Sequence, residues 1–164
     1  MDVLVSHVTR EMIFYFDGDV KRISHALKVY AFAKSIGELT DIGEEKLRIL
    51  ELSAILHDIG IKESEKKYAS SAARYQEAEG PPVARFLLSK INVDKNCEDR
   101  ICYIIGHHHT YGKIDDIDFQ ILVEADFLVN IAEGDIQKKE IGTIRQKYFK
   151  TNAGISFLDS MYGK

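Results

Sequence analysis

Apolar residues recur at intervals of three and four along most of the chain, which is the spacing of one face of an α-helix. The stretch 117–133 shows this pattern best; the apolar residues that share its stripe are Ile117, Ile121, Leu122, Ala125, Leu128, Val129 and Ala132. Alternation with a period of two, which is typical of strands, is scarce. The pattern predicts an all-helical protein, with helices at about 6–16, 19–37, 43–58, 63–78, 82–91, 95–108, 117–133 and 136–149.

Glycine and proline mark the expected helix ends. Pro81 and Pro82 are adjacent and directly follow Gly80. A glycine commonly ends a helix, and a proline commonly begins the next one, where its missing N–H costs nothing. We therefore expect one helix to end at Gly80. The isoleucine-rich segment 100–109 would also suit a strand, but its length and the spacing of its apolar residues favour a helix.

Composition narrows the class of protein. A chain of 164 residues with 45% hydrophobic and 29% charged residues is expected to form one soluble domain, here a compact helical bundle over 1–164. A net charge of -4 argues against binding to a nucleic-acid polymer, which requires a basic surface. We find no apolar run of about 18 residues and no basic start typical of a signal peptide, so neither a membrane nor export is expected. The expected compartment is the cytoplasm.

Ionisable residues interrupt the apolar stripes. Asp126 follows Leu122 by four residues and precedes Val129 by three, so it shares the buried face of its helix. An unpaired carboxylate in that position would be costly or would take up a proton. Two ordinary explanations are a bond to a buried arginine or to the backbone, and a position at the wet edge of the stripe.

Two further segments carry polar groups on the same kind of face. His57 and Asp58 end a stretch in which Ala54 continues the apolar spacing, and His25 precedes Val29 by four. A single histidine on an apolar face is more often a satisfied core residue than a ligand. Here three separate helices would each bring nitrogen or oxygen donors to one interior. A divalent cation would satisfy two buried carboxylates at once.

The order and context of these residues resemble a known signature. His25, then His57-Asp58 within Ala-Ile-Leu-His-Asp-Ile-Gly, then Asp126 within Glu-Ala-Asp-Phe-Leu-Val-Asn is similar to the H…HD…D pattern of the HD-domain phosphohydrolase superfamily. The resemblance covers residues from about 20 to about 135. It implies a helical bundle around a metal held by the four residues, and hydrolysis of phosphoester or phosphoanhydride bonds, usually in nucleotides.

Subfamily signatures match less well. The cyclic-di-GMP phosphodiesterases with an HD-GYP signature have a lysine three residues after the aspartate of the pair, and the deoxyribonucleoside 5′-monophosphatases have a glutamate there; this chain has Ile61. Dinuclear members, which include diadenosine tetraphosphate hydrolases, add a histidine four residues before a glycine that begins a helix. In this chain the residue four positions before Gly80 is Gln76, and Glu77 follows it. The dinuclear members have another histidine in a segment that is similar to residues 104–110 of this chain. The resemblance thus implies half of a second metal site, with Gln76 or Glu77 in place of an imidazole and His107 as the histidine.

The chain also has three consecutive histidines, His107, His108 and His109. On a helix they span about 200° of arc, so they cannot all face one site. They could also simply be solvated near a loop. We expect at least one of them to face the metal or the substrate phosphate, with His107 ahead of His108.

These residues suggest a mechanism in which a metal-activated water attacks phosphorus. Asp58 would act as the base or orient the water, and would bridge two metals if two bind. His107 or His108 would protonate the leaving oxygen or bind the second metal. Nearby basic residues that could contact the substrate phosphate are Arg22, Lys62 and Arg74. The expected cofactor is one divalent ion, or two, of Fe, Mn, Co, Ni, Zn or Mg.

The expected function is therefore a metal-dependent phosphohydrolase that acts on a small phosphorylated substrate such as a nucleotide. One alternative is a non-catalytic HD-like module that binds a nucleotide as a sensor. Another is a structural helical domain in which His57 and Asp58 only cap helices, which predicts no metal.

Overall fold

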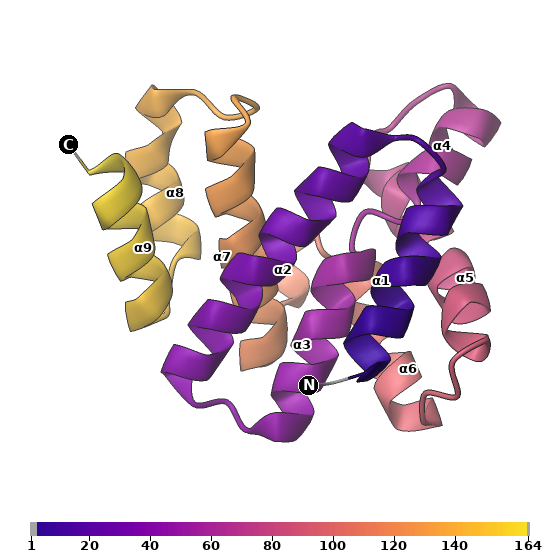
Figure 1. The fold of residues 1–164 in the computed structure, drawn as a ribbon. Coiled ribbons are helices and arrows are strands. Elements are labelled where there is room, and N and C mark those ends of the chain that lie inside the picture. Colours follow the sequence, from indigo (N-terminus) through magenta and orange to yellow (C-terminus); the bar gives the residue numbers. More distant parts are fainter. Residues whose placement is uncertain (1–2, 164) are drawn as a thin grey trace.

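The computed structural model describes residues 3–163, which form helices joined by short connections (Figure 1). The α-helices are α1 (Val3–Phe16), α2 (Val20–Thr40), α3 (Glu44–Leu56), α4 (Ile61–Tyr68), α5 (Ala73–Ser89), α6 (Lys95–Ile105), α7 (Ile117–Ala132), α8 (Ile141–Tyr148) and α9 (Asn152–Tyr162), with 3-10 turns η1 (Tyr111–Lys113) and η2 (Lys138–Glu140). No strand occurs among these residues. The predicted all-α fold is confirmed.

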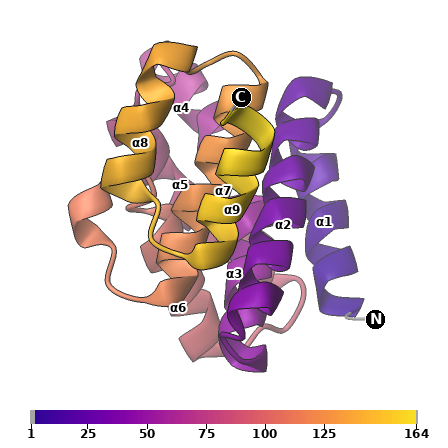
Figure 2. The same cartoon turned by 90° about the vertical axis from the view of Figure 1, so that its left-hand side faces the viewer.

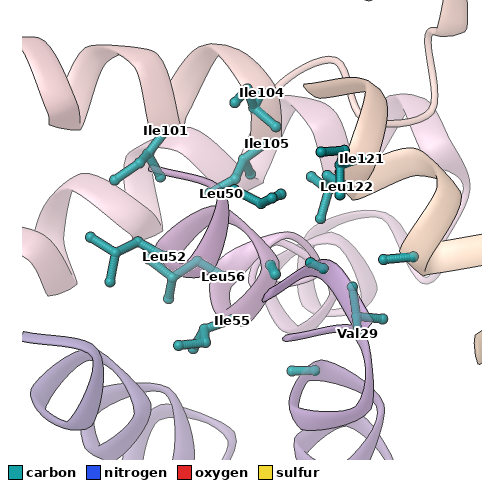
Figure 3. Close-up of a cluster of buried hydrophobic side chains, with 14 of the residues drawn as sticks. Val29, Leu50, Leu52, Ile55, Leu56, Ile101, Ile104, Ile105, Ile121 and Leu122 are labelled. Carbon is teal, nitrogen blue, oxygen red and sulfur yellow. The ribbon is translucent and has the colours of Figure 1, made fainter. Parts of the chain in front are cut away.

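Helix α3 lies at the centre of the bundle. Every residue of its second half, Ile49–Leu56, is buried. Figure 3 shows Leu50 and Leu56 of this helix facing isoleucines of α6 and α7, with Val29 of α2 on another side. Because burying one such side chain contributes about 1.5–3 kcal/mol, this cluster dominates the packing. It fixes α2, α3 and α7 against one another.

The other helices flank this centre on two sides. α1 packs on α2 and α3, while α4, α5 and α6 form a second group on that side of the bundle (Figure 1). α8 and α9 stand at the opposite side, where α9 contacts α7 and α2 (Figure 2). Within residues 3–163, none of the helices has the length and apolar character that a bilayer crossing requires.

The expected helix break at Gly80 is wrong. Helix α5 continues through Gly80, Pro81 and Pro82 to Ser89, and the break lies earlier, between α4 and α5, where Ala69 adopts a left-handed conformation at φ 50°. Prolines in a helix remove hydrogen bonds but have a helix-compatible φ. Here packing compensates for them, because Gly80 is buried against Ile105 of α6 and the backbone of Gly60.

The C-terminal helix α9 was not predicted from the sequence. It begins after Thr151, whose hydroxyl accepts a hydrogen bond from the backbone N–H of Gly154 at 2.9 Å. The predicted helix 136–149 also proves to be the 3-10 turn η2 followed by the shorter α8. Both differences arise because these short helices depend on packing against α7 rather than on a strong periodic pattern.

Gly60, two residues after Asp58, permits a close approach of two backbones. A methyl group there would lie 2.4 Å from the carbonyl oxygen of Gln76 and 2.6 Å from the nitrogen of Gly80. The φ of Gly60 is -76°, so the glycine is needed for space rather than for conformation. This contact fixes the first half of α5 beside the turn that carries His57 and Asp58.

Gly60→Ala should therefore destabilise the fold by about 1–3 kcal/mol, because backbone atoms would have to move apart. Thermal unfolding would show this as a midpoint lower by roughly 3–10 °C. Gly142→Ala is the matched control, since nothing lies within 4 Å of the added methyl group in α8. We expect Gly142→Ala to be neutral or stabilising by up to about 1 kcal/mol. Equal midpoints for the two variants would contradict this account of Gly60.

Candidate metal centre

Four side chains from three segments meet in the interior. His25 comes from α2, His57 and Asp58 from the turn after α3, and Asp126 from α7. The Nε2 atom of His25 lies 3.2 Å from Nε2 of His57 and 3.1 Å from Oδ1 of Asp126. Oδ2 of Asp58 lies 3.4 Å from both Nε2 atoms. The structure thus places all four predicted ligands around one point.

These separations match the geometry of a coordination shell. Nitrogen and oxygen ligands bind ions such as Zn²⁺ at about 2.0–2.2 Å. Two ligands at that distance from a common ion, at tetrahedral or octahedral angles, are about 3.0–3.5 Å apart. The five atom pairs that include at least one histidine Nε2, among them His57 and Asp126 at 3.4 Å, fall within this range. The donor set therefore fits a divalent cation.

Hydrogen bonds orient both imidazoles toward this point. Nδ1 of His57 donates to the carbonyl oxygen of Ala54 at 2.7 Å, which leaves the lone pair on Nε2 when the ring is neutral. Nδ1 of His25 lies 2.9 Å from Oε2 of Glu133, just beyond the end of α7. A carboxylate behind a histidine ligand fixes the ring and makes its other nitrogen more basic. Both rings are thus held ready to bind a cation through Nε2.

The charges at this centre stabilise one another. Burial opposes the charged form of His57, but the carboxylates of Asp58 and Asp126 outweigh it and raise the pKa of His57 well above its usual value. Burial likewise opposes ionisation of Asp58, yet His57 and His108 hold the pKa of Asp58 well below its usual range. Both carboxylates therefore remain ionised in the interior, and they require positive charge beside them. A divalent cation supplies that charge without a proton.

A second group of donors shares Asp58 with the first. Oδ1 of Asp58 lies 3.3 Å from Nε2 of His108, and one ligand atom each of Asp58, His108 and His109 lies within 4.8 Å of the others. Nδ1 of His108 donates to the carbonyl oxygen of Ile105, so Nε2 carries the lone pair. That buried Nε2 has no hydrogen-bond partner among the residues described. An unpaired buried nitrogen beside a carboxylate is suited to hold an ion.

His109 completes this second group. Burial lowers the pKa of His109 to about 4, so its ring is neutral near pH 7. Its Nε2 lies 3.2 Å from Oε1 of Gln76. Gln76 thus lies at the second group, as the sequence comparison implied, whereas Glu77 accepts a hydrogen bond from Thr110 instead.

His107 lies elsewhere. Its Nδ1 bonds to the carbonyl oxygen of Tyr103 at 2.7 Å, and its ring packs on that of Tyr103 with centroids 4.5 Å apart. The expected order of the three histidines is therefore reversed, because His108 and not His107 contacts Asp58. The turn that ends α6 at Gly106 causes this, since it rotates the last two histidines inward and leaves the first against its own helix.

The three basic residues expected at the phosphate are engaged elsewhere. Arg22 forms ion pairs with Asp19 and Glu65, at 2.9 and 2.5 Å. Lys62 donates to the backbone oxygen of Tyr15, and Arg74 lies over the ring of Tyr75. The ion pair of Arg22 with Glu65 joins α2 to α4, the bond of Lys62 joins α4 to α1, and the contact of Arg74 stays within α5. No contact among the described residues therefore supports phosphate binding by these three side chains.

The sequence analysis missed Glu133. It follows Asp126 by seven residues, which is two helical turns, so both lie on the same side of α7. That spacing is the signal that could have identified it. The sequence analysis also gave His109 no specific role.

Comparisons with known proteins agree with this geometry. The sequence profile of the HD domain matches residues 22–137, which is most of the chain. A search of proteins with curated functions gives no match. The crystal structure of a predicted HD superfamily hydrolase from an uncultured Thermotogales bacterium has a similar fold, with a TM-score of 0.68 at 20% identity, covering 99% of this chain and 85% of that one.

HD domains bind divalent metals, and the side-chain groups described above could hold such ions. With the profile match and the His25, His57-Asp58 and Asp126 cluster in agreement, the chain belongs to the HD domain family.

Proposed function

We propose that this protein is a metal-dependent phosphohydrolase that cleaves a phosphoester or phosphoanhydride bond in a small substrate such as a nucleotide. The observation that supports this best is a set of four donor atoms whose separations from one another, for the pairs joined through the two histidines, are 3.1–3.4 Å. A bound divalent cation would neutralise phosphoryl oxygens and make water more acidic. The net charge of -4 fits a small substrate better than a nucleic-acid polymer or a membrane surface.

Asp58 has the central role in this proposal. Its two carboxylate oxygens face different groups, Oδ2 toward His25 and His57 and Oδ1 toward His108. A carboxylate in this position can accept a proton from an attacking water or orient it. It can also bridge two cations, the second held by His108 and His109 with Gln76 beside them. We therefore assign Asp58 both to metal binding and to catalysis.

The histidines after α6 suit metal binding better than proton donation. When its ring is neutral, His108 presents a lone pair on Nε2, because Nδ1 bonds to Ile105. His109, with a pKa of about 4, is neutral near pH 7, so it carries no imidazolium proton to donate to a leaving group. We assign both to a second cation. The nitrogen and oxygen donors admit Fe, Mn, Co, Ni, Zn or Mg.

Metal content and hydrolysis test the proposal together. Protein purified without a histidine tag should contain metal and hydrolyse members of a nucleotide and phosphoester panel with Mn²⁺, Co²⁺ or Fe²⁺. Asp58→Ala and Asp126→Asn should lose both properties, with activity lower by at least about a hundredfold. Asp135→Asn, an exposed carboxylate just past α7, is the control. Full metal occupancy and activity in Asp58→Ala would contradict the assignment, and tight nucleotide binding without turnover would favour a sensor.

Removal of metal should lower thermal stability. A cation present at about a hundredfold above its Kd stabilises the folded state by about 2.7 kcal/mol. For a chain of this size we expect a chelator to lower the unfolding midpoint by roughly 5–10 °C. Asp126→Asn should show a smaller chelator effect, because Asp126 contacts the first proposed cation and not the second. A wild-type midpoint that chelator and added metal leave unmoved would favour the purely structural alternative.

Glu133→Gln should weaken metal binding without unfolding the protein. The amide keeps the shape of the side chain but removes the charge behind His25, and loss of such a partner typically costs 10- to 100-fold in affinity. Calorimetric titration of Mn²⁺ or Zn²⁺ into metal-stripped protein measures this directly. Unchanged affinity, or an equal loss in Asp135→Asn, would show that Glu133 does not support His25.

A further inference from the structure

A groove of about 500 Å³ lies between η1 and the segment 147–150, where α8 leads into the connection to α9. Tyr111 and Ile114 form one wall, and Lys147, Tyr148 and Lys150 form the other. The second wall lies outside the part of the chain that matches the HD domain, which ends at residue 137. This groove thus combines the histidine segment of the centre with helices added after the family's core.

Four polar side chains of the groove have no hydrogen-bond or ion-pair partner among the described residues; they belong to Tyr111, Lys147, Tyr148 and Lys150. The ammonium groups of Lys147 and Lys150 form no ion pair with any residue in 3–163. The hydroxyl groups of Tyr111 and Tyr148 likewise form no hydrogen bond within the described chain. This differs from Arg22, Lys62 and Arg74, whose charged ends are already engaged. Two unpaired ammonium groups on one wall favour an anionic ligand.

Two tyrosine rings line the same groove, and the buried Phe127 packs behind them. The ring centroids of Tyr111 and Tyr148 are 4.6 Å apart. Phe127 stacks on Tyr148 at 5.1 Å and lies 5.5 Å from Tyr111. Aromatic clusters of this kind stack nucleobases at about 1–3 kcal/mol per base, in addition to their packing role.

The second wall is held in place by buried hydrogen bonds from α7. The fully buried carboxylate of Glu124 accepts bonds from the backbone N–H groups of Lys150 and Thr151 and from the hydroxyl of Thr151. Gln120 donates to the backbone oxygen of Tyr148 at 2.7 Å. Because these donors satisfy Glu124, the wall has one defined position relative to α7, the helix that carries Asp126.

Sequence and packing connect the groove to the metal centre. Tyr111 follows His109 by two residues, and Phe127 directly follows Asp126. The rings of Tyr111 and Phe127 contact each other, with centroids 5.5 Å apart. The groove therefore adjoins the two segments that carry His109 and Asp126.

We propose that this groove binds the part of the substrate beyond the phosphate that is hydrolysed, and that this part is a nucleoside bearing phosphate. The base would stack against Tyr148 and Tyr111, and the lysines would contact phosphate oxygens. The proposal rests on the proposed hydrolase function for the placement of the scissile phosphate. It makes Lys147, Tyr148 and Lys150 residues that determine specificity rather than catalytic residues.

Binding to metal-loaded protein tests this inference without turnover. The probes are α,β-methylene-ADP, whose bridging carbon prevents cleavage between its phosphorus atoms, and inorganic phosphate, which lacks the nucleoside. Wild type should bind the nucleoside probe more tightly than phosphate. Lys147→Gln with Lys150→Gln should weaken binding of the nucleoside probe about tenfold, because charge-assisted bonds are lost, and leave phosphate binding unchanged.

Two further variants sharpen the test. Lys138→Gln with Lys139→Gln removes the same charge next to α8 but outside the groove, and should change neither affinity. Tyr148→Leu should weaken only the nucleoside probe. Equal loss for both probes, loss in the control pair, or no preference for the nucleoside in wild type would each overturn the proposal. If no substrate is hydrolysed but the binding pattern is as expected, the proposed function is contradicted and the assignment of the groove is not.

Discussion

Two carboxylates that face the same two imidazoles are the constraint on which the rest of this structure depends. The buried Asp126 and the partly buried Asp58 each approach Nε2 of His57 at 3.4 Å. Carboxylates that share partners in a poorly solvated site repel each other, and positive charge beside them offsets that repulsion. Protons on the histidines can do so in part, and a divalent cation held by the four groups would do so more fully. The positions of α2, α3 and α7 follow from this requirement and from the apolar core around α3.

Helix α7 links the metal centre to the rest of the molecule. One side of α7 presents Asp126 to Nε2 of His25. Two helical turns later, just beyond the end of α7, Glu133 lies against Nδ1 of the same histidine. Gln120 and Glu124 hold the connection between α8 and α9 through hydrogen bonds to its backbone. A single helix therefore positions both Asp126, a candidate metal ligand, and the segment 148–151 that follows α8.

That His25, His57, Asp58 and Asp126 meet in the fold could be predicted from the sequence, because the signal of each residue is local; their role as ligands stays a prediction. His25, His57 and Asp126 each fall on an apolar face, and the order of the residues follows a family pattern, so no long-range information was needed. Continuity of α5 through Pro81 could not be predicted, since it depends on the contact between Gly60 and Gly80, twenty residues apart in the chain. The order of the histidines also depended on a turn whose direction a periodic pattern does not specify. His108 faces the centre because the chain turns at Gly106.

Direct location of the ion would test the central claim best. In crystals of the protein grown with Mn²⁺, diffraction recorded at a wavelength where manganese scatters anomalously would show where the metal lies. The account predicts a peak about 2.0–2.3 Å from Nε2 of His25 and His57 and from the carboxylate oxygens of Asp58 and Asp126. A fully ordered site with these four side chains in place and no peak between them would contradict it.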